Sequence, residues 1–387
     1  MLILKIKIDL LIENYRFGLE VKIIWSYIMS IGLDNVVAAE TKLSHVDGER
    51  GRLIIGGKLL DDLAFSQDYE TVLSSLFQGQ FNREFTPAEV NTLLSEARQD
   101  VFLELSQFDQ HLINLTSIDA LRSLISRFSD ENNAATAFKL IAALGVFTSA
   151  LIRKRQGEPL ITPQPGLNHA TDILQMAGLD YSDIHSRALN TYLVTIIDHG
   201  LNASTFASRV IASTKSGLVS SVIAAISALK GPLHGGAPGP VLDMLDDIDN
   251  PENAKSWLQN ALSRNERLMG FGHRVYKVRD PRADALKRAI STLQDSASIS
   301  GHRLALAAIV EELALQALKE KKPDHPLHTN VEFYTALLLE ALGFDREDFT
   351  SIFAVGRVGG WIAHAREQII NGRLIRPKSH YIGILPD

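Results

Sequence analysis

Apolar residues recur at spacings of three and four along most of the chain, which is the periodicity of helices that bury one face. One of these stretches opens with Thr86-Pro87, a helix-capping residue followed by a proline in the first turn. The stretches that carry the pattern most clearly are 61–79, 86–108, 117–128, 133–155, 185–200 and 216–230. The sequence therefore predicts an almost entirely α-helical protein.

The pattern changes toward the N-terminus. The segment 31–60 is short, rich in turn-forming residues and mixed in polarity. This predicts small strands or irregular structure. Residues 1–28 are unlike the rest of the chain, and their longest uncharged stretch, 23–33, is too short to span a bilayer. Their acidic residues argue against a transit peptide. We interpret 1–28 as an extension upstream of a natural start at Met29, and we expect a soluble, cytoplasmic protein without membrane contact.

The helix predicted at 216–230 stops abruptly in "LKGPLHGGAPGPV", Leu229–Val241. Gly231 is placed to cap the helix end, and Pro232 prevents its continuation. His234 is therefore expected in a turn and not on a buried helix face. The glycines that follow it leave room for a ligand to approach the backbone.

Composition excludes several classes of protein. The chain has 387 residues, a formal net charge of −6 and no cysteine. The absence of cysteine excludes disulfide scaffolds, thiolate zinc sites and cysteine nucleophiles. A mildly acidic chain also lacks the basic bias of a nucleic-acid binder, so we expect no nucleic-acid partner. Any anionic ligand must be held by locally clustered arginine and lysine.

Other stretches offer chemistry of the same kind. "GFGHRVYKVRDPR" places His273 after Gly270-Phe271-Gly272 and before a basic run; a plain exposed basic loop is the alternative. Glu332, one turn into an apolar helix in "NVEFY", must be partnered or have a raised pKa. His199 closes another apolar helix, where a capping or core histidine is the alternative. We expect no metal site.

Histidines at glycine turns, a semi-buried carboxylate and isolated arginines make a coherent set. Imidazoles polarise carbonyls, and arginines bind carboxylates in a fork geometry. A carboxylate can remove a proton from carbon next to a carbonyl. The residue types therefore predict enolate chemistry on a carboxylate-bearing substrate.

In order along the chain, "VVAAETKLSHVDGERG", "HGLNASTF", "KGPLHGGA", "GFGHRVYKVRDPR", "NVEFY", "GRVGGWIAH" and "RPKSHYIG" resemble the citrate synthase family from about Ile31 to the C-terminus. The resemblance implies an all-α homodimer with the active site in a cleft between two helical domains. The large domain would comprise 29–235 and 342–387, and the small domain 236–341. Oxaloacetate and an acyl-CoA would be the substrates, with no cofactor.

The resemblance also implies roles for individual residues. His234 matches the histidine that hydrogen-bonds the acetyl-CoA carbonyl, His273 the one that polarises the oxaloacetate ketone, and Glu332 the base. His199, Arg282 and Arg357 match oxaloacetate binders, and Arg376 matches an arginine that reaches the partner subunit's site. The CoA-binding loop corresponds to Leu268, Met269, Gly270, Phe271 and Gly272.

One departure from the family pattern bears on activity. The family usually has aspartate where this chain has Glu332, and a base misplaced by about 1 Å can lose roughly a hundredfold in rate. A working citrate synthase is the leading hypothesis. A 2-methylcitrate synthase that uses propionyl-CoA is an alternative, because one methyl group changes binding by only about 1–3 kcal/mol. A non-catalytic oxaloacetate- or CoA-binding homologue is a less favoured one.

Overall fold

The computed structural model describes residues 31–33, 36–235, 238–273, 275–295, 301–321, 323 and 327–385. The chain divides into two compact units, Met1–Thr41 and Lys42–Asp387. In the first unit the described residues include a 3-10 turn, η1, at Ile31–Leu33. The predicted extension at 1–28 and the start at Met29 lie outside the described residues.

A small antiparallel sheet opens the second unit. It consists of β1 (Ser44–Asp47), β2 (Arg52–Ile55) and β3 (Lys58–Leu59) in the order β1-β2-β3. Ser44 pairs with Ile55, and Ile54 with Leu59. This confirms the expectation of short strands within residues 31–60.

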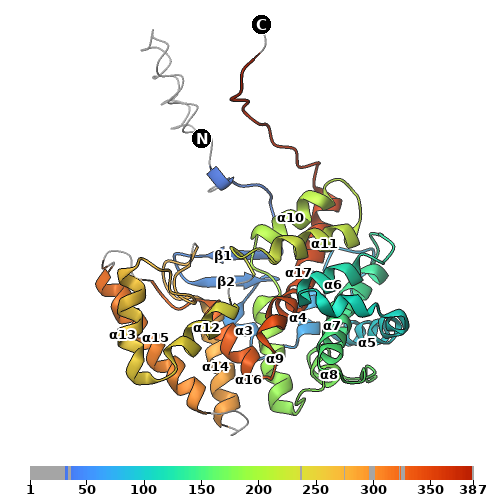
Figure 1. The fold of residues 1–387 in the computed structure, drawn as a ribbon. Coiled ribbons are helices and arrows are strands. Elements are labelled where there is room, and N and C mark those ends of the chain that lie inside the picture. The colour runs from blue at the N-terminus through green and yellow to red at the C-terminus, as the bar shows by residue number, and fades with distance from the viewer. Residues whose placement is uncertain are drawn as a thin grey trace, which may run out of the picture. The chain divides into compact units, whose positions relative to one another are not determined.

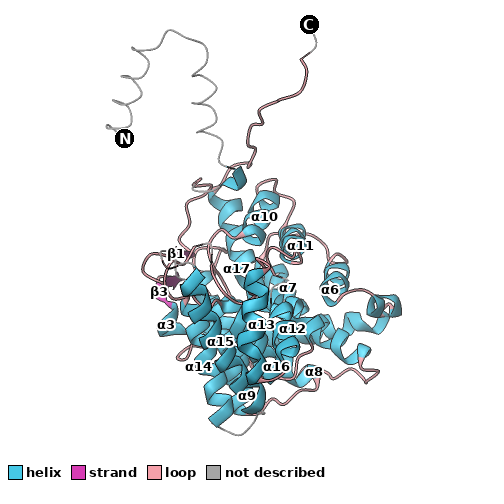
Figure 2. Ribbon diagram, turned by 60° about the vertical axis from the view of Figure 1, so that its left-hand side comes forward, coloured by secondary structure: helices cyan, strands magenta, loops and turns pink. Residues whose placement is uncertain are grey.

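Helices form nearly all of the rest of the second unit (Figure 2). The first half contains α3 (Leu60–Leu63), α4 (Tyr69–Leu76), α5 (Pro87–Leu103), α6 (Ser117–Ile125), α7 (Ala134–Arg155), α8 (His169–Ala177), α9 (Asp183–Ile196), α10 (Ala203–Ala212) and α11 (Leu218–Leu229). The second half contains α12 (Pro238–Ile248), α13 (Pro251–Ser263), α14 (Pro281–Asp295), α15 (Gly301–Lys321), α16 (Val331–Ala341) and α17 (Phe349–Asn371). Short 3-10 turns lie at Glu104–Gln107, Gln110–Asn114 and Arg346–Asp348.

Local sequence explains several helix ends. Thr86 and Glu89 form a reciprocal capping box at the start of α5, as the Thr86-Pro87 pair predicted. The stretch 61–79 forms two helices, α3 and α4, because Asp68 caps a new helix by accepting the backbone N–H of Thr71. At the end of α11, Lys230 is the cap residue, and Gly231 does not have the left-handed backbone of a glycine cap. The helix ends where we expected, without that cap.

Two long helices form the core. α7 is long and apolar enough to cross a membrane, but 83% of its most apolar window is buried inside the protein, where α5, α6, α8 and α17 pack against it. α17 is buried along almost its whole length and packs on α4, α7, α9, α10 and α11. Both are therefore core helices of the second unit.

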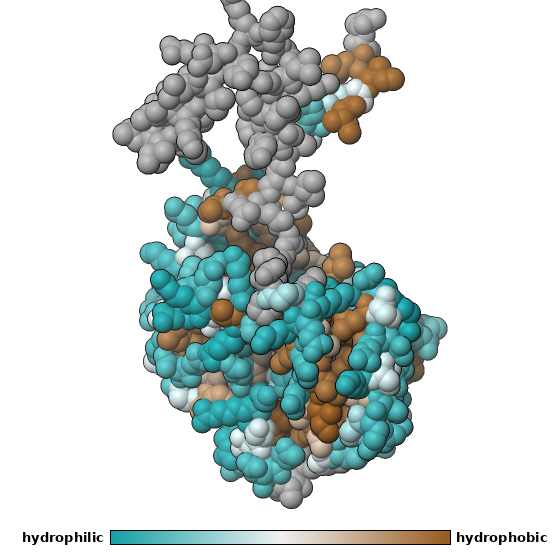
Figure 3. All heavy atoms as spheres, turned by 90° about the vertical axis from the view of Figure 1, so that its left-hand side faces the viewer, coloured by the Kyte–Doolittle hydropathy of each residue, from teal (hydrophilic) through white to brown (hydrophobic). Residues whose placement is uncertain are grey.

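The helices α12–α16 gather on one side of the second unit in Figure 1. Among them α13 packs on α15, and both α12 and α14 pack on α16. The face over α13 and α15 is mainly hydrophilic, with apolar residues in a strip (Figure 3). α14 also packs on α9, which itself packs on the core helix α17. The division into domains at 236–341 remains a prediction.

Candidate active site

His199 lies in the turn after α9, where a buried network fixes the backbone. The neighbouring Asp198 accepts a hydrogen bond from His364 Nε2 on α17 at 3.0 Å. His364 in turn contacts Arg209 Nη1 at 2.8 Å, and Arg209 pairs with Glu367 at 2.7 Å. Burial, together with the nearby Arg282 and Arg357, lowers the pKa of His199 well below its ordinary value. His199 is therefore a neutral imidazole at neutral pH.

His234 stands in the turn that follows α11, as its glycine-rich surroundings predicted. Its backbone N–H donates to Gly231 O at 2.9 Å, and Gly235 N–H reaches back to Leu229 O at 2.9 Å. Ser204, at the start of α10, contacts the ring twice: its backbone N–H donates to Nε2 at 3.3 Å, and its hydroxyl lies 2.8 Å from the same nitrogen.

The contact with Ser204 decides which ring nitrogen of His234 carries the proton. A backbone N–H can only donate, so Nε2 accepts and we infer that the neutral ring carries its proton on Nδ1. Burial first, and the Arg357 charge second, lower the pKa of His234 to about 4. The side chain therefore presents a neutral N–H donor on its Nδ1 side.

His273 has the opposite arrangement. Its Nδ1 accepts backbone N–H bonds from Val275 and Tyr276, each at 3.0 Å, which leaves the proton of the neutral ring on Nε2. Burial and the Arg282 charge lower the pKa of His273 to about 4. Nε2 lies 3.1 Å from Arg282 Nη2, so two donors converge on one point without an acceptor between them. That arrangement suits a ligand oxygen.

Arg282 and Arg357 supply positive charge from two sides. Arg282, in the first turn of α14, is held by Asp280 through Nε at 3.0 Å and Nη2 at 2.8 Å. Arg357, in the middle of α17, donates through Nε to Ile196 O and lies over the Phe353 ring. It is only 1% exposed, and no carboxylate of the described residues lies within ion-pair distance. Burial lowers the pKa of Arg357 to about 10, so it remains a cation at neutral pH.

Glu332 is the second residue of α16, not one turn into the helix as we expected. Asn330 caps the helix by accepting the Glu332 backbone N–H at 3.1 Å, which fixes the start at Val331. Burial raises the pKa of the Glu332 carboxyl against the lowering effect of Arg282. Its Oε2 is buried and has no hydrogen-bond partner among the described residues. A raised pKa and an unpartnered oxygen suit a carboxylate that takes up a proton.

Backbone pairing brings the His273 turn to the Glu332 helix. Gly272 N–H donates to His328 O at 2.8 Å, and Asn330 N–H donates to Gly270 O at 2.9 Å. The same turn borders a hollow of about 440 Å³ whose lining includes Leu268, Phe271, Gly272 and His273. Met269 and Gly270 belong to the loop but not to this lining. The lining also includes two cationic residues, Arg267 and Lys321, and one acidic residue, Glu266.

Residues 32–378 match the sequence profile of the citrate synthase family described as its C-terminal domain. A citrate synthase of Haloferax volcanii is 37% identical over 374 residues, which covers 91% of this chain and 95% of that protein. The chain belongs to the citrate synthase family. It is an enzyme, an acyltransferase of the citrate synthase type, and its fold is the all-α fold of that family.

Two other proteins similar to this citrate synthase-family chain carry different names, one a 2-methylcitrate synthase and the other a citrate synthase. A 2-methylcitrate synthase of Mycobacterium tuberculosis is 33% identical over 372 residues, covering 91% of this chain and 90% of the relative. A Thermoplasma acidophilum citrate synthase was solved as a ternary complex with carboxymethyl coenzyme A and oxaloacetate. Its structure aligns with a TM-score of 0.80, 28% identity and coverage of 93% of this chain and 97% of that one. Proteins named citrate synthase and 2-methylcitrate synthase thus both occur among similar proteins.

Arg376, which the family resemblance assigned to the site, lies apart from the other predicted site residues. Arg376 is exposed in the extended segment that follows α17, and among the described residues no contact ties it to His199 or Arg357. The assignment of Arg376 to a partner subunit's site remains a prediction. The other six site residues, His199, His234, His273, Arg282, Glu332 and Arg357, are linked by the contacts and charge interactions described above.

Two residues that contact the candidate site, Tyr276 and Ser204, were not identified from the sequence. Tyr276 donates or accepts through its hydroxyl at 3.1 Å from His199 Nε2, and its ring lies 4.8 Å from that of His273. Ser204 holds His234, and Trp361 Nε1 donates to the Ser204 hydroxyl at 3.1 Å. Both lie within motifs that carried the resemblance, but nothing in their local pattern marks them as site residues.

Proposed function

We propose that the protein condenses acetyl-CoA with oxaloacetate and water to give citrate and CoA. The observation that carries the proposal is the buried Arg357 cation, which has no ion-pair partner among the described residues and lies within electrostatic reach of Arg282 and His199. A buried unpaired charge is costly, and a carboxylate ligand compensates it. Oxaloacetate has two carboxylates and a ketone, which match two guanidiniums and the donor on His273 Nε2.

The first chemical step would form the nucleophile. Glu332 removes a proton from the acetyl methyl group, while the Nδ1–H of His234 donates to the thioester oxygen on which negative charge develops. A neutral imidazole with a pKa near 4 is a donor that stays un-ionised throughout. The electron pair of the broken C–H bond becomes the C=C double bond of the enol(ate).

The second step would join the two substrates. The enol(ate) carbon attacks the ketone carbon of oxaloacetate, and the ketone oxygen takes its developing charge into the donors of His273 and Arg282. The resulting alkoxide takes up one proton, which balances the proton that Glu332 removed from the methyl group, and the product is citryl-CoA. Water then adds to its thioester, which releases citrate and the CoA thiol. No metal or redox partner enters this balance.

The acyl-CoA is assigned to the hollow beside Leu268–Gly272, with Arg267 and Lys321 facing its anionic part. Extending the family resemblance, we propose a cytoplasmic homodimer in which Arg376 reaches the partner's site, with the large domain at 29–235 and 342–387 and the small domain at 236–341. The reaction would be the entry step of the tricarboxylic acid cycle. The exposed tail after α17, with Ile382 and Ile384 each 91% exposed, supports a partner subunit that covers it.

The decisive experiment measures CoA thiol release with oxaloacetate, comparing acetyl-CoA and propionyl-CoA at equal concentrations. We expect faster release from acetyl-CoA. A preference for propionyl-CoA moves the function to 2-methylcitrate synthesis by the same residues. No release from either, with oxaloacetate still bound in calorimetry, contradicts the enzyme assignment and favours a binding protein.

A further inference from the structure

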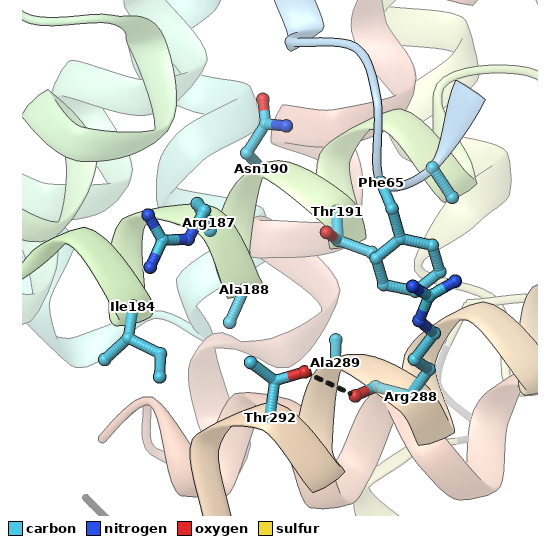
Figure 4. Close-up of a pocket in the computed structure, with 10 residues that line it drawn as sticks. Phe65, Ile184, Arg187, Ala188, Asn190, Thr191, Arg288, Ala289 and Thr292 are labelled. Atoms are coloured by element: carbon cyan, nitrogen blue, oxygen red, sulfur yellow. Dashed lines mark hydrogen bonds between the residues drawn. The ribbon is translucent and has the colours of Figure 1, made fainter. Parts of the chain in front are cut away.

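A second hollow of about 250 Å³ lies between α9 and α14, apart from the residues of the active site. Ala64 and Phe65, directly after α3, border it from a third direction. Figure 4 shows its lining side chains. Asn190 is fixed elsewhere, since its amide accepts from Tyr69 N at 2.9 Å and donates to Gln67 O at 3.0 Å. The remaining polar groups of the lining come from arginines and threonines.

The two facing helices contribute the same short pattern. α9 carries Arg187-Ala188-Leu189-Asn190-Thr191, and α14 carries Arg288-Ala289-Ile290-Ser291-Thr292. In each, arginine, alanine and threonine line the hollow. In Figure 4 each arginine lies toward the same end as the threonine of the opposite helix. The small alanines leave the middle open. The Thr292 hydroxyl donates to Arg288 O of its own helix at 3.1 Å, so the donor that stands at each end is the guanidinium of an arginine.

The charge of the lining is purely positive. Among the ten residues that line the hollow there are two arginines and no aspartate or glutamate. Neither Arg187 nor Arg288 forms an ion pair with a described carboxylate, whereas Lys287, next in the chain to Arg288, pairs with Glu311 at 2.9 Å. The Arg288 guanidinium lies 4.1 Å from the centre of the Phe65 ring, which holds it at the rim. Such a site favours anions.

We propose that this hollow binds a compact dianion with one charged group at each end, a dicarboxylate or a diphosphate. The one guanidinium at each end, Arg187 and Arg288, matches two anionic groups, and the alanines between them accommodate a short linker. Occupancy acts on the active site, because α9 leads directly into His199 and α14 begins at Pro281-Arg282. A ligand wedged between these helices changes the spacing of two residues assigned to oxaloacetate. This coupling rests on the proposed function; the binding does not.

The test is isothermal titration calorimetry on the full-length protein with two probes, inorganic pyrophosphate and succinate. We expect one of them to bind, and Arg187→Gln and Arg288→Gln each to weaken that binding at least tenfold. Arg127→Gln, an exposed arginine after α6, is the matched control and leaves the affinity unchanged. The probe that binds tells a phosphate-bearing from a carboxylate-bearing ligand. Steady-state kinetics with the bound probe should then show a several-fold change in KM for oxaloacetate.

Three results overturn the proposal: neither probe binds, the arginine variants bind as the native protein does, or binding disappears in Arg357→Gln but not in Arg187→Gln. The last would place the probe at the oxaloacetate site. Calorimetry needs no turnover, so the two proposals can fail separately. If the protein binds a probe through Arg187 and Arg288 but releases no CoA, the binding site is confirmed and the proposed reaction is contradicted.

Discussion

His234 and His273 both lie in glycine-rich turns, yet the backbone holds them by different nitrogens. Ser204 N–H occupies Nε2 of His234, and the N–H groups of Val275 and Tyr276 occupy Nδ1 of His273. Burial holds the pKa of each near 4, so both rings are neutral at neutral pH. Each therefore offers one N–H donor, and the donors stand at different ring positions. This suits two oxygens, a thioester and a ketone, that gain charge in succession.

Arg357 gives the sharpest prediction for binding. Arg357→Gln should raise KM for oxaloacetate by about 10- to 100-fold, since hydrogen bonds to charged groups contribute roughly 1.5–3 kcal/mol. Because no described carboxylate lies within ion-pair distance of Arg357, the substitution removes a buried charge without breaking an ion pair, but it also removes the bond to Ile196 O and the favourable charge near Asp198. The denaturation midpoint should therefore change little. Oxaloacetate-dependent kinetics and chemical denaturation measure the two effects. An unchanged KM contradicts the assignment.

Glu332 gives a prediction for chemistry. Glu332→Gln should lower the rate of methyl-proton exchange of acetyl-CoA by about 10²–10⁴-fold, the usual contribution of a general base. The native rate should fall as pH drops through the raised pKa of Glu332, because protonation removes the base. The variant should lack this acidic limb. Glu332→Asp, which keeps a carboxylate, is the matched control and should retain the limb at reduced rate. Persistent exchange in Glu332→Gln means that another group is the base.

At the scale of elements, α17 approaches the turn that carries His199 because glycines face it. A methyl group at Gly360 would lie 2.2 Å from Ile197 O, and one at Gly356 would lie 2.5 Å from the Ile196 side chain. The first neighbour is backbone and cannot rotate away. The helix can therefore place Arg357 and His364 against residues 196–198 only with glycine at position 360, whereas at position 356 the Ile196 side chain would have to shift.

Gly360→Ala tests this packing. We expect about 1–3 kcal/mol of destabilisation, the usual cost of overpacking, together with a raised KM for oxaloacetate because the His199 turn is displaced. Gly301→Ala, at the start of α15, is the control, since the nearest atom to a methyl group there is 4.0 Å away. It should leave KM unchanged and stability equal or slightly higher. Denaturation and kinetics that match the native protein in Gly360→Ala contradict the packing argument.

At the scale of the molecule, the site is assembled from segments that are distant in sequence. The turns after α9 and α11, the stretch 268–282, the start of α16 and the middle of α17 all contribute. Every one of them lies in the compact unit Lys42–Asp387. None of the six residues proposed for the site therefore comes from the first unit.

A chain that begins at Met29 should accordingly keep the kcat and the KM values of the full chain within about twofold. Thiol release by the two proteins, purified side by side, measures this. A tenfold loss in the shortened protein would show that residues 1–28 contribute to activity or assembly, and it would contradict our interpretation of them as an upstream extension. The same comparison in size-exclusion chromatography reports the oligomeric state.

Much of the fold and of the candidate site was predictable from the sequence, for local reasons. Helical periodicity depends on neighbours three and four residues away, so the sequence alone was enough to place α5, α6, α7, α9 and α11. The Thr86 capping box is encoded within four residues. The glycine-framed His234 and His273 stood out by composition. The family motifs then related these histidines to arginines and a carboxylate elsewhere in the chain.

Only the tertiary structure decided what depends on distant packing. It placed Glu332 in the first turn of α16, gave α11 an end without a left-handed glycine, and brought Tyr276 to His199 from 77 residues away. It also set the protonated nitrogen of each histidine and opened a hollow between the matching patterns of α9 and α14. The physical reason is that pattern reports which face of an element is buried, whereas pKa, tautomer and cavity depend on which other element buries it.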